Sequence, residues 1–218
     1  SGRRAAPAGG ASRDRQGGPP GPRGGLSLSR RPRLRPPPGW YLLLLGLTGA
    51  QRLRELARSR RHERRTVGPR AAPRTYPLMV ALHLGLFVLP PLEVALGGRR
   101  ARRPALWVGL LVAATGLRWW SIRALGPSWN VRAVVPADLR PVTSGPYRFV
   151  RHPNYLAVIL EMWALPMAGG ARRSALVLSL LNALVLWPRI RAEERLLAAV
   201  PGYDEAFRGR ARFLPGLF

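Results

Sequence analysis

Five apolar runs separated by arginine-rich segments are the feature that most constrains this chain. The two clearest runs are Tyr76–Leu96 and Pro104–Leu125, and crossing the hydrocarbon core of a bilayer takes roughly 20 residues. A helix satisfies its own backbone hydrogen bonds, so it is the expected form for such a run in lipid. The pattern therefore predicts an all-α, polytopic membrane protein.

Three further runs bring the prediction to about five transmembrane helices: Gly39–Leu56, Pro153–Ala168 and Ser174–Trp187. A short turn at Gly169–Arg173 separates the last two, so we expect a C-terminal helical hairpin. The first run is short in its strictly apolar part. We expect it to continue as an amphipathic helix bearing Leu53 and Leu56.

Unusual residues inside the runs carry local expectations. Pro90 and Pro91 should kink or break the second span, and Glu93 should face the bundle or lie near the interface. Gly109 and Gly116 predict close approach of a neighbouring helix to the third span.

Charge and composition narrow the class of partner. The chain has 36 basic and 10 acidic residues, and every basic residue is Arg. A charge of +26 can indicate nucleic acid, but these arginines fall between apolar runs, as in a membrane protein with basic loops. We expect the lipid bilayer as a partner and no nucleic acid. With no Cys, three His and no HxxxH pair, we expect no metal site.

Loop charge also predicts topology and domain organisation. The positive-inside rule places the loops after the first and third spans, and the C-terminal tail, in the cytoplasm. The nine arginines of residues 1–38 conflict with that rule. This Arg-, Pro- and Gly-rich segment cannot bury a core, so we predict a disordered tail before a membrane domain at residues 39–218. The pattern leaves the true N-terminus and the oligomeric state open.

The stretch from residue 142 to 161, VTSGPYRFVRHPNYLAVILE, groups polar residues just before an apolar helix. Pro153 suits the first turn of a helix, so the cluster should sit at a helix N-terminus, where free N–H groups favour an anionic ligand. Residue by residue, a second interpretation holds: Arg151 and His152 are interfacial cations, and Tyr147 and Tyr155 are belt aromatics.

A second polar pair follows the last apolar run. Arg189 and Glu193 are four residues apart, so they share one face of a helix. Spacing alone slightly favours a surface ion pair, which contributes only about 0.3–0.5 kcal/mol.

The spacing G-P-Y-x-x-x-R-H-P-x-Y resembles the isoprenylcysteine carboxyl methyltransferase family and its relatives among the phospholipid methyltransferases. The resemblance covers roughly Tyr76 to Phe218, including the tail string R-F-x-P-G. It implies an integral-membrane O-methyltransferase that uses S-adenosyl-L-methionine, with a cytosolic cofactor pocket and a lipophilic small-molecule acceptor. The strings RWWSIRALGPSWNVR and RHPNYLAVILE look most like bacterial members thought to methylate alkylresorcinol and alkylpyrone polyketides, which implies a bacterial inner membrane.

The resemblance also assigns roles to single residues. Arg189 would meet and orient the methyl acceptor, and Glu193 would meet the cofactor. An upstream polar position of the family falls on Arg132, which is not an amide here. The other residues implied for the cofactor are Tyr147, His152, Pro153, Asn154 and Tyr155, with Leu139, Arg140, Pro141 and Val142 holding adenine through their backbone.

Two alternatives remain open at this point. A membrane-bound, NADPH-dependent reductase of the sterol type also carries an R-H-P-N-Y string, although its usual lead-in differs from G-P-Y-R-F-V. A non-enzymatic basic membrane scaffold would need none of the assigned side chains. The acceptor oxygen, on a carboxylate, a phenol or an enol, stays open as well.

Overall fold

The computed structural model describes residues 34–64, 67–97, 100–136 and 139–214. The predicted disordered tail, residues 1–38, falls almost wholly outside these ranges and stays a prediction. All of the described residues belong to one compact unit, Pro32–Phe218.

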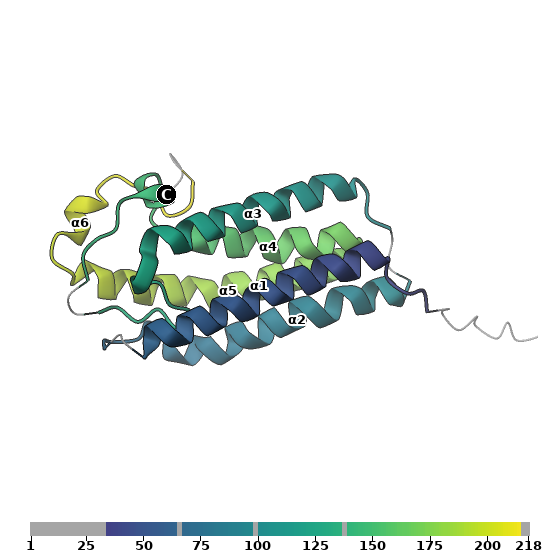
Figure 1. The fold of residues 1–218 in the computed structure, drawn as a ribbon, viewed down its shortest axis with the longest axis horizontal. Coiled ribbons are helices and arrows are strands. Elements are labelled where there is room, and N and C mark those ends of the chain that lie inside the picture. The colour runs from purple at the N-terminus through teal and green to yellow at the C-terminus, as the bar shows by residue number, and fades with distance from the viewer. Residues whose placement is uncertain (1–33, 65–66, 98–99, 137–138, 215–218) are drawn as a thin grey trace, which may run out of the picture. The chain divides into compact units, whose positions relative to one another are not determined.

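Helices account for the fold (Figure 1). The five long helices lie side by side, and α6 lies beyond the C-terminal end of α5. The described residues form no sheet, only isolated bridges at Arg70–Val134 and Val150–Ala211, which confirms the all-α prediction for this part of the chain. The long elements are α1 (Gly39–Glu63), α2 (Tyr76–Ala95), α3 (Pro104–Leu125), α4 (Pro153–Gly169) and α5 (Arg172–Ala198). The short ones are η1 (Pro73–Thr75), η2 (Gly126–Ser128), η3 (Gly145–Arg148) and α6 (Tyr203–Ala206).

Proline and glycine set several of the boundaries. Pro104 and Pro153 open α3 and α4 at the first helical position, where the missing N–H costs nothing. Gly170 ends α4 with a φ of 87°, a conformation that glycine adopts freely. The hairpin between α4 and α5 therefore turns within the segment that the sequence predicts.

Internal prolines do not end α2 or α5. Pro90 and Pro91 do not break the second span, because α2 runs from Tyr76 to Ala95, close to the predicted bounds, and a kink at these prolines stays a prediction. Likewise α5 passes through Pro188 as one helix up to Ala198. Neighbouring helices can support the backbone around a proline in a membrane helix, and α5 packs against both α2 and α4.

Three helices in the described ranges are long and apolar enough to cross a membrane: Pro73–Ala95, Pro104–Ser128 and Arg172–Ala198. These spans support an integral membrane protein. Glu93, inside the first of them, accepts hydrogen bonds from the backbone N–H groups of Arg173 and Ser174 at 3.1 and 2.7 Å. The carboxylate thus satisfies free N–H groups at the start of α5, and lies toward the bundle as expected.

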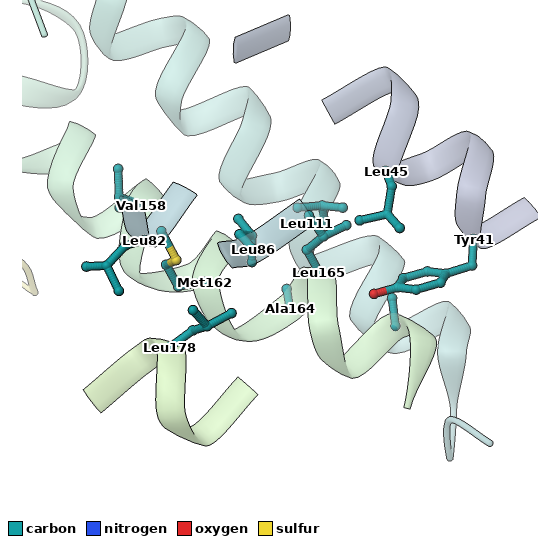
Figure 2. Packing of buried hydrophobic residues seen from close by; sticks show 11 residues of the cluster. Tyr41, Leu45, Leu82, Leu86, Leu111, Val158, Met162, Ala164, Leu165 and Leu178 are labelled. Carbon is teal, nitrogen blue, oxygen red and sulfur yellow. The ribbon is translucent and has the colours of Figure 1, made fainter. Parts of the chain in front are cut away.

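Figure 2 shows the main hydrophobic core, to which all five long helices contribute. Leu86, Met162 and Leu165 are almost completely buried at its centre. Because α4 supplies the largest share of these side chains, it is the helix around which the others pack. The buried cluster comprises Tyr41, Leu45, Leu82, Leu86, Leu111, Val158, Met162, Ala164, Leu165, Ala168 and Leu178.

Close approach of helices occurs at a different glycine from those expected. A Cβ atom built on Gly109 or Gly116 would meet nothing within 4 Å, so those two glycines are not at a close helix contact. A Cβ on Gly169 would lie 2.4 Å from Cζ of Tyr41. Gly169 therefore lets the Tyr41 ring of α1 pack directly on the end of α4.

The second half of α1 directs charged side chains toward the neighbouring helices. Leu53 is 70% exposed, whereas Leu56 is half-buried. Arg52 and Glu55 are half-buried as well. Arg52 pairs with both Glu55 and Glu161 of α4, and Nη2 of Arg118 on α3 lies 2.8 Å from Oε2 of Glu55.

We predict that Gly169→Ala destabilises the protein, because the new methyl group would collide with the Tyr41 ring. Overpacking of this kind costs about 1–3 kcal/mol. Thermal unfolding in detergent measures the effect, and Gly109→Ala is the matched control because its Cβ would meet nothing. Equal unfolding temperatures for the two variants would contradict the prediction.

Candidate functional site

A cavity of about 160 Å³ lies where the 128–142 segment, η3, the start of α4, the end of α5 and α6 come together. Its lining mixes apolar, aromatic and charged side chains. The residues that line it are Met79, His83, Arg118, Leu125, 128–131, 133–136, 139–142, Tyr147, Arg151, His152, Asn154, Tyr155, Val158, Arg189, Glu193, Leu197, Tyr203 and Phe207.

The structure brings nearly all the sequence-derived site residues to this cavity. One predicted residue stays outside the lining: Pro153 is buried at the first position of α4. Those that line the cavity are Leu139, Arg140, Pro141, Val142, Tyr147, His152, Asn154, Tyr155, Arg189 and Glu193.

Arg189 is buried, with 2% of its surface exposed, so the surface ion-pair interpretation is wrong. Its Nε donates to the hydroxyl of Tyr155 at 3.1 Å, and Nη2 donates to the Val131 carbonyl. The Tyr155 hydroxyl in turn donates to Glu193. The Tyr155 hydroxyl therefore bridges Arg189 and Glu193.

The imidazole of His152 contacts Glu194, whose Oε1 lies 3.2 Å from Nε2. Arg212 makes a two-pronged contact with the same carboxylate, at 2.8 and 2.9 Å. This hydrogen bond raises the pKa of Arg212 above its ordinary value. The two neighbouring acids of α5 therefore have different partners. Glu193 lines the cavity, whereas Glu194 links His152 to Arg212 of the C-terminal segment.

The C-terminal segment also holds the start of α4 through its backbone. The N–H groups of Arg151 and His152 donate to the carbonyls of Ala211 and Arg212, both at 2.9 Å. Arg210 donates from Nη1 to the Tyr147 carbonyl at 2.7 Å. The string before α4 and the string after α5 therefore close on each other, as the sequence predicts.

The other wall of the cavity, residues 128–142, is fixed by contacts that sequence reasoning missed. Asn130 accepts from the Val134 N–H at 2.7 Å and donates to the Val134 carbonyl at 3.0 Å. Ser59 of α1 accepts from the Val131 N–H at 2.9 Å. The upstream position expected at Arg132 lies outside the lining, paired with Glu63 at 3.3 Å, whereas Asn130 of the same segment belongs to the lining.

Three polar atoms of the lining residues are buried without a hydrogen-bond partner among the described residues: Asn154 Oδ1, Arg118 Nη1 and Arg189 Nη1. Leaving such atoms unpaired costs about 1–3 kcal/mol each, and sites that bind a ligand commonly carry this cost. These residues therefore hold one carbonyl acceptor and two guanidinium donors whose hydrogen-bonding capacity is unused.

The charge of the lining favours anionic groups. Its described residues include four arginines, Arg118, Arg140, Arg151 and Arg189, against the single carboxylate of Glu193. Burial raises the pKa of Tyr147 and of Tyr203 above the ordinary value, and the nearby Glu193 charge adds to the effect. Both phenols therefore stay neutral and can donate hydrogen bonds.

Comparisons with known proteins agree with this site. The profile of the isoprenylcysteine carboxyl methyltransferase family matches residues 107–199. The uncharacterized protein YpbQ of Bacillus subtilis is 30% identical over 163 residues, which cover 72% of this chain and 96% of that protein. The chain belongs to the isoprenylcysteine carboxyl methyltransferase family. The matched range contains the string before α4 and the α5 residues Arg189, Glu193 and Glu194, and it ends before the C-terminal segment that contacts them.

A second relative matches a shorter part of this chain. The cobalt-zinc-cadmium resistance protein CzcN of Cupriavidus metallidurans is 32% identical over 119 residues, covering 54% of this chain and 55% of that protein. Family membership supports a methyltransferase embedded in a membrane. The three apolar helices agree with that assignment.

We predict that Arg212→Gln loosens the contact between the C-terminal segment and α4. Losing this partly exposed pair should weaken local protection by about 1 kcal/mol, roughly fivefold in amide exchange. Hydrogen–deuterium exchange of the Arg151 and His152 amides measures the change. Arg208→Gln, at an exposed position nearby, is the control. Unaltered exchange in Arg212→Gln would show that Glu194 does not secure the segment.

Proposed function

We propose that this protein is an integral-membrane, S-adenosyl-L-methionine-dependent O-methyltransferase that acts on a lipophilic acceptor. The observation that carries the proposal is the meeting of two separate strings at one cavity. His152 and Tyr155 lie at the start of α4, whereas Arg189 and Glu193 lie near the end of α5.

The chemistry of the lining fits the proposed cofactor. The molecule offers an amino acid head, a ribose diol, an adenine and a positively charged sulfur. Glu193 and Oδ1 of Asn154 can accept hydrogen bonds from the head or the diol, and the N-terminus of α4 favours its carboxylate. Tyr147 and Phe207 supply aromatic surface for adenine, beside the backbone of residues 139–142.

Further residues complete the proposed cofactor site. His152 and Tyr155 would hold the head group and the ring face, while Pro153 fixes the helix start that presents them. Leu139, Arg140, Pro141 and Val142 would contact adenine through backbone atoms. We place the membrane methyltransferase domain at residues 39–218.

Methyl transfer would need little acid–base chemistry when the acceptor oxygen is already an anion, and bound S-adenosyl-L-methionine would supply a methyl group activated on sulfur. The protein contributes alignment, which lowers the barrier by fixing the reacting groups in place. Arg189 would direct Nη1 to the acceptor oxygen and stabilise its negative charge. The Tyr155 hydroxyl, bonded to both Arg189 and Glu193, would keep the acceptor site and the cofactor site in register.

We further propose that α1 and α4 also enter the bilayer, giving about five spans. At 17 residues α4 is roughly 25 Å long, slightly less than the hydrocarbon core, and its inward position permits this. The arginine-rich loops would put the cavity on the cytoplasmic side of a bacterial inner membrane. A long-chain polyketide phenol or enol is the proposed acceptor type, with an isoprenylcysteine-like carboxylate as the alternative.

Cofactor binding tests the proposed site directly. Purified protein in detergent should bind S-adenosylhomocysteine in isothermal titration calorimetry, and His152→Ala or Glu193→Ala should weaken binding by more than about tenfold, or 1.4 kcal/mol. Glu205→Gln, a change at an exposed acid, should leave affinity unchanged. Unchanged affinity in both site variants, or binding of NADPH in place of S-adenosylhomocysteine, would overturn the assignment.

Product formation tests the role of Arg189. Lipid extracts from cells that make the protein should contain a species heavier by one CH₂ group, detected by mass spectrometry. Arg189→Gln should abolish that species while cofactor binding persists, because its guanidinium meets the acceptor. Arg191→Gln is the matched control on the same helix, at an exposed position. Equal product from wild type and Arg189→Gln would exclude the proposed role.

A further inference from the structure

Arg118 is a buried cation that none of the roles described so far uses. It belongs to α3, has 6% of its surface exposed and lines the cavity. Its Nε donates to Oε2 of Glu55 at 2.8 Å, and Nη2 lies 2.8 Å from the same oxygen. Nη1 is buried and has no hydrogen-bond partner in the described ranges.

The contacts of Glu55 fix where Arg118 lies. Its other oxygen, Oε1, accepts from Gln51 at 3.0 Å, and Arg52 pairs with both Glu55 and Glu161. The group therefore contains two guanidinium groups and two carboxylates, so it is neutral overall. A charged side chain inside a bundle of membrane helices costs free energy and is found mainly where it has a function. Packing of the helices gives no reason for Nη1 of Arg118 to be buried without a hydrogen-bond partner.

The surroundings of Arg118 differ from those of the proposed cofactor residues. Met79 and His83 of α2 and Val158 of α4 line the cavity together with Arg118. These residues come from long helices, two of which are apolar enough to cross a membrane. The residues assigned to the cofactor come mostly from the loop before α4 and from the end of α5. Arg118 is therefore the residue in the helical part of the lining that could contact a polar group carried by a lipid.

We propose that Arg118, held in place by Glu55, binds the acidic oxygen of the acceptor and selects long-chain lipids that carry an anionic oxygen over neutral lipids with the same chain. The inference rests on the proposed function for the reaction that follows binding. Arg118 would share the anion with Arg189, the other lining arginine whose Nη1 is unpaired. Glu55 is a positioning residue, since it acts through Arg118.

A matched pair of probes tests the selection. Tritium-labelled palmitate and methyl palmitate have the same chain, but only palmitate carries a charge. Binding of each to the purified full-length chain in detergent is measured with saturating S-adenosylhomocysteine. The wild type should prefer palmitate by about tenfold or more, and Arg118→Gln should reduce that preference to about threefold or less, the part that Arg189 retains, while binding the ester equally well. Arg123→Gln is the control, because Arg123 is exposed on the same helix and lies over the Trp119 ring.

A second variant keeps the test decisive if Arg118→Gln folds poorly. Glu55→Gln combined with Arg118→Gln leaves no unpaired carboxylate at that position, and its unfolding temperature reports folding. A palmitate preference reduced to the same extent in this folded variant supports the proposal. An undiminished preference in either variant, or the absence of a preference in the wild type, overturns it.

The two hypotheses fail in different ways. A wild type that prefers palmitate through Arg118 but does not bind S-adenosylhomocysteine would refute the proposed cofactor and leave the anion site standing. A wild type that binds S-adenosylhomocysteine but treats palmitate and its ester alike would refute the anion site and leave the methyltransferase assignment intact.

Discussion

The Glu194 carboxylate joins parts of the chain that are far apart in sequence, and the cavity depends on it. It contacts His152 at the start of α4 and Arg212 near the C-terminal end, while belonging itself to α5. A charge-assisted, two-pronged contact of this kind fixes direction as well as distance. Backbone hydrogen bonds from Arg151 and His152 to the C-terminal segment then complete the closure. The polar residues at the mouth of α4 thus become one wall of a cavity.

Apolar runs and prolines made the helices predictable, whereas charges made their packing hard to predict. The third span begins and ends where the sequence indicates, because Pro104 opens it and Gly126 ends it. The sequence does not indicate the ion pairs of α1, since Arg52 pairs with Glu161, 109 positions away. No local pattern reveals a pairing over that separation. The sequence indicates a helical stretch after Pro188 but not its continuity with the last span, because support from neighbouring helices offsets the lost hydrogen bond.

The site was predictable as a set of residues but not as a set of contacts. Motif spacing predicted that His152, Tyr155, Arg189 and Glu193 belong to one site. It did not indicate that the Tyr155 hydroxyl bridges Arg189 and Glu193, or that His152 contacts Glu194. Adjacent helix positions differ by about 100° in direction, so one acid faces the cavity and the next turns away. Only the packing of α5 decides which acid does so.

The continuity of α5 has a mechanical consequence. The helix runs unbroken from Arg172, beside the hairpin turn, to Ala198, so its lipid-facing part and its cavity-lining part form one rod. Any tilt that the surrounding bilayer imposes on the rod also displaces Arg189 and Glu193. Bilayers differ in thickness, and a helix responds to a mismatch chiefly by tilting. Under the proposed function, the alignment of the reacting groups would therefore be coupled to the thickness of the membrane that holds the protein.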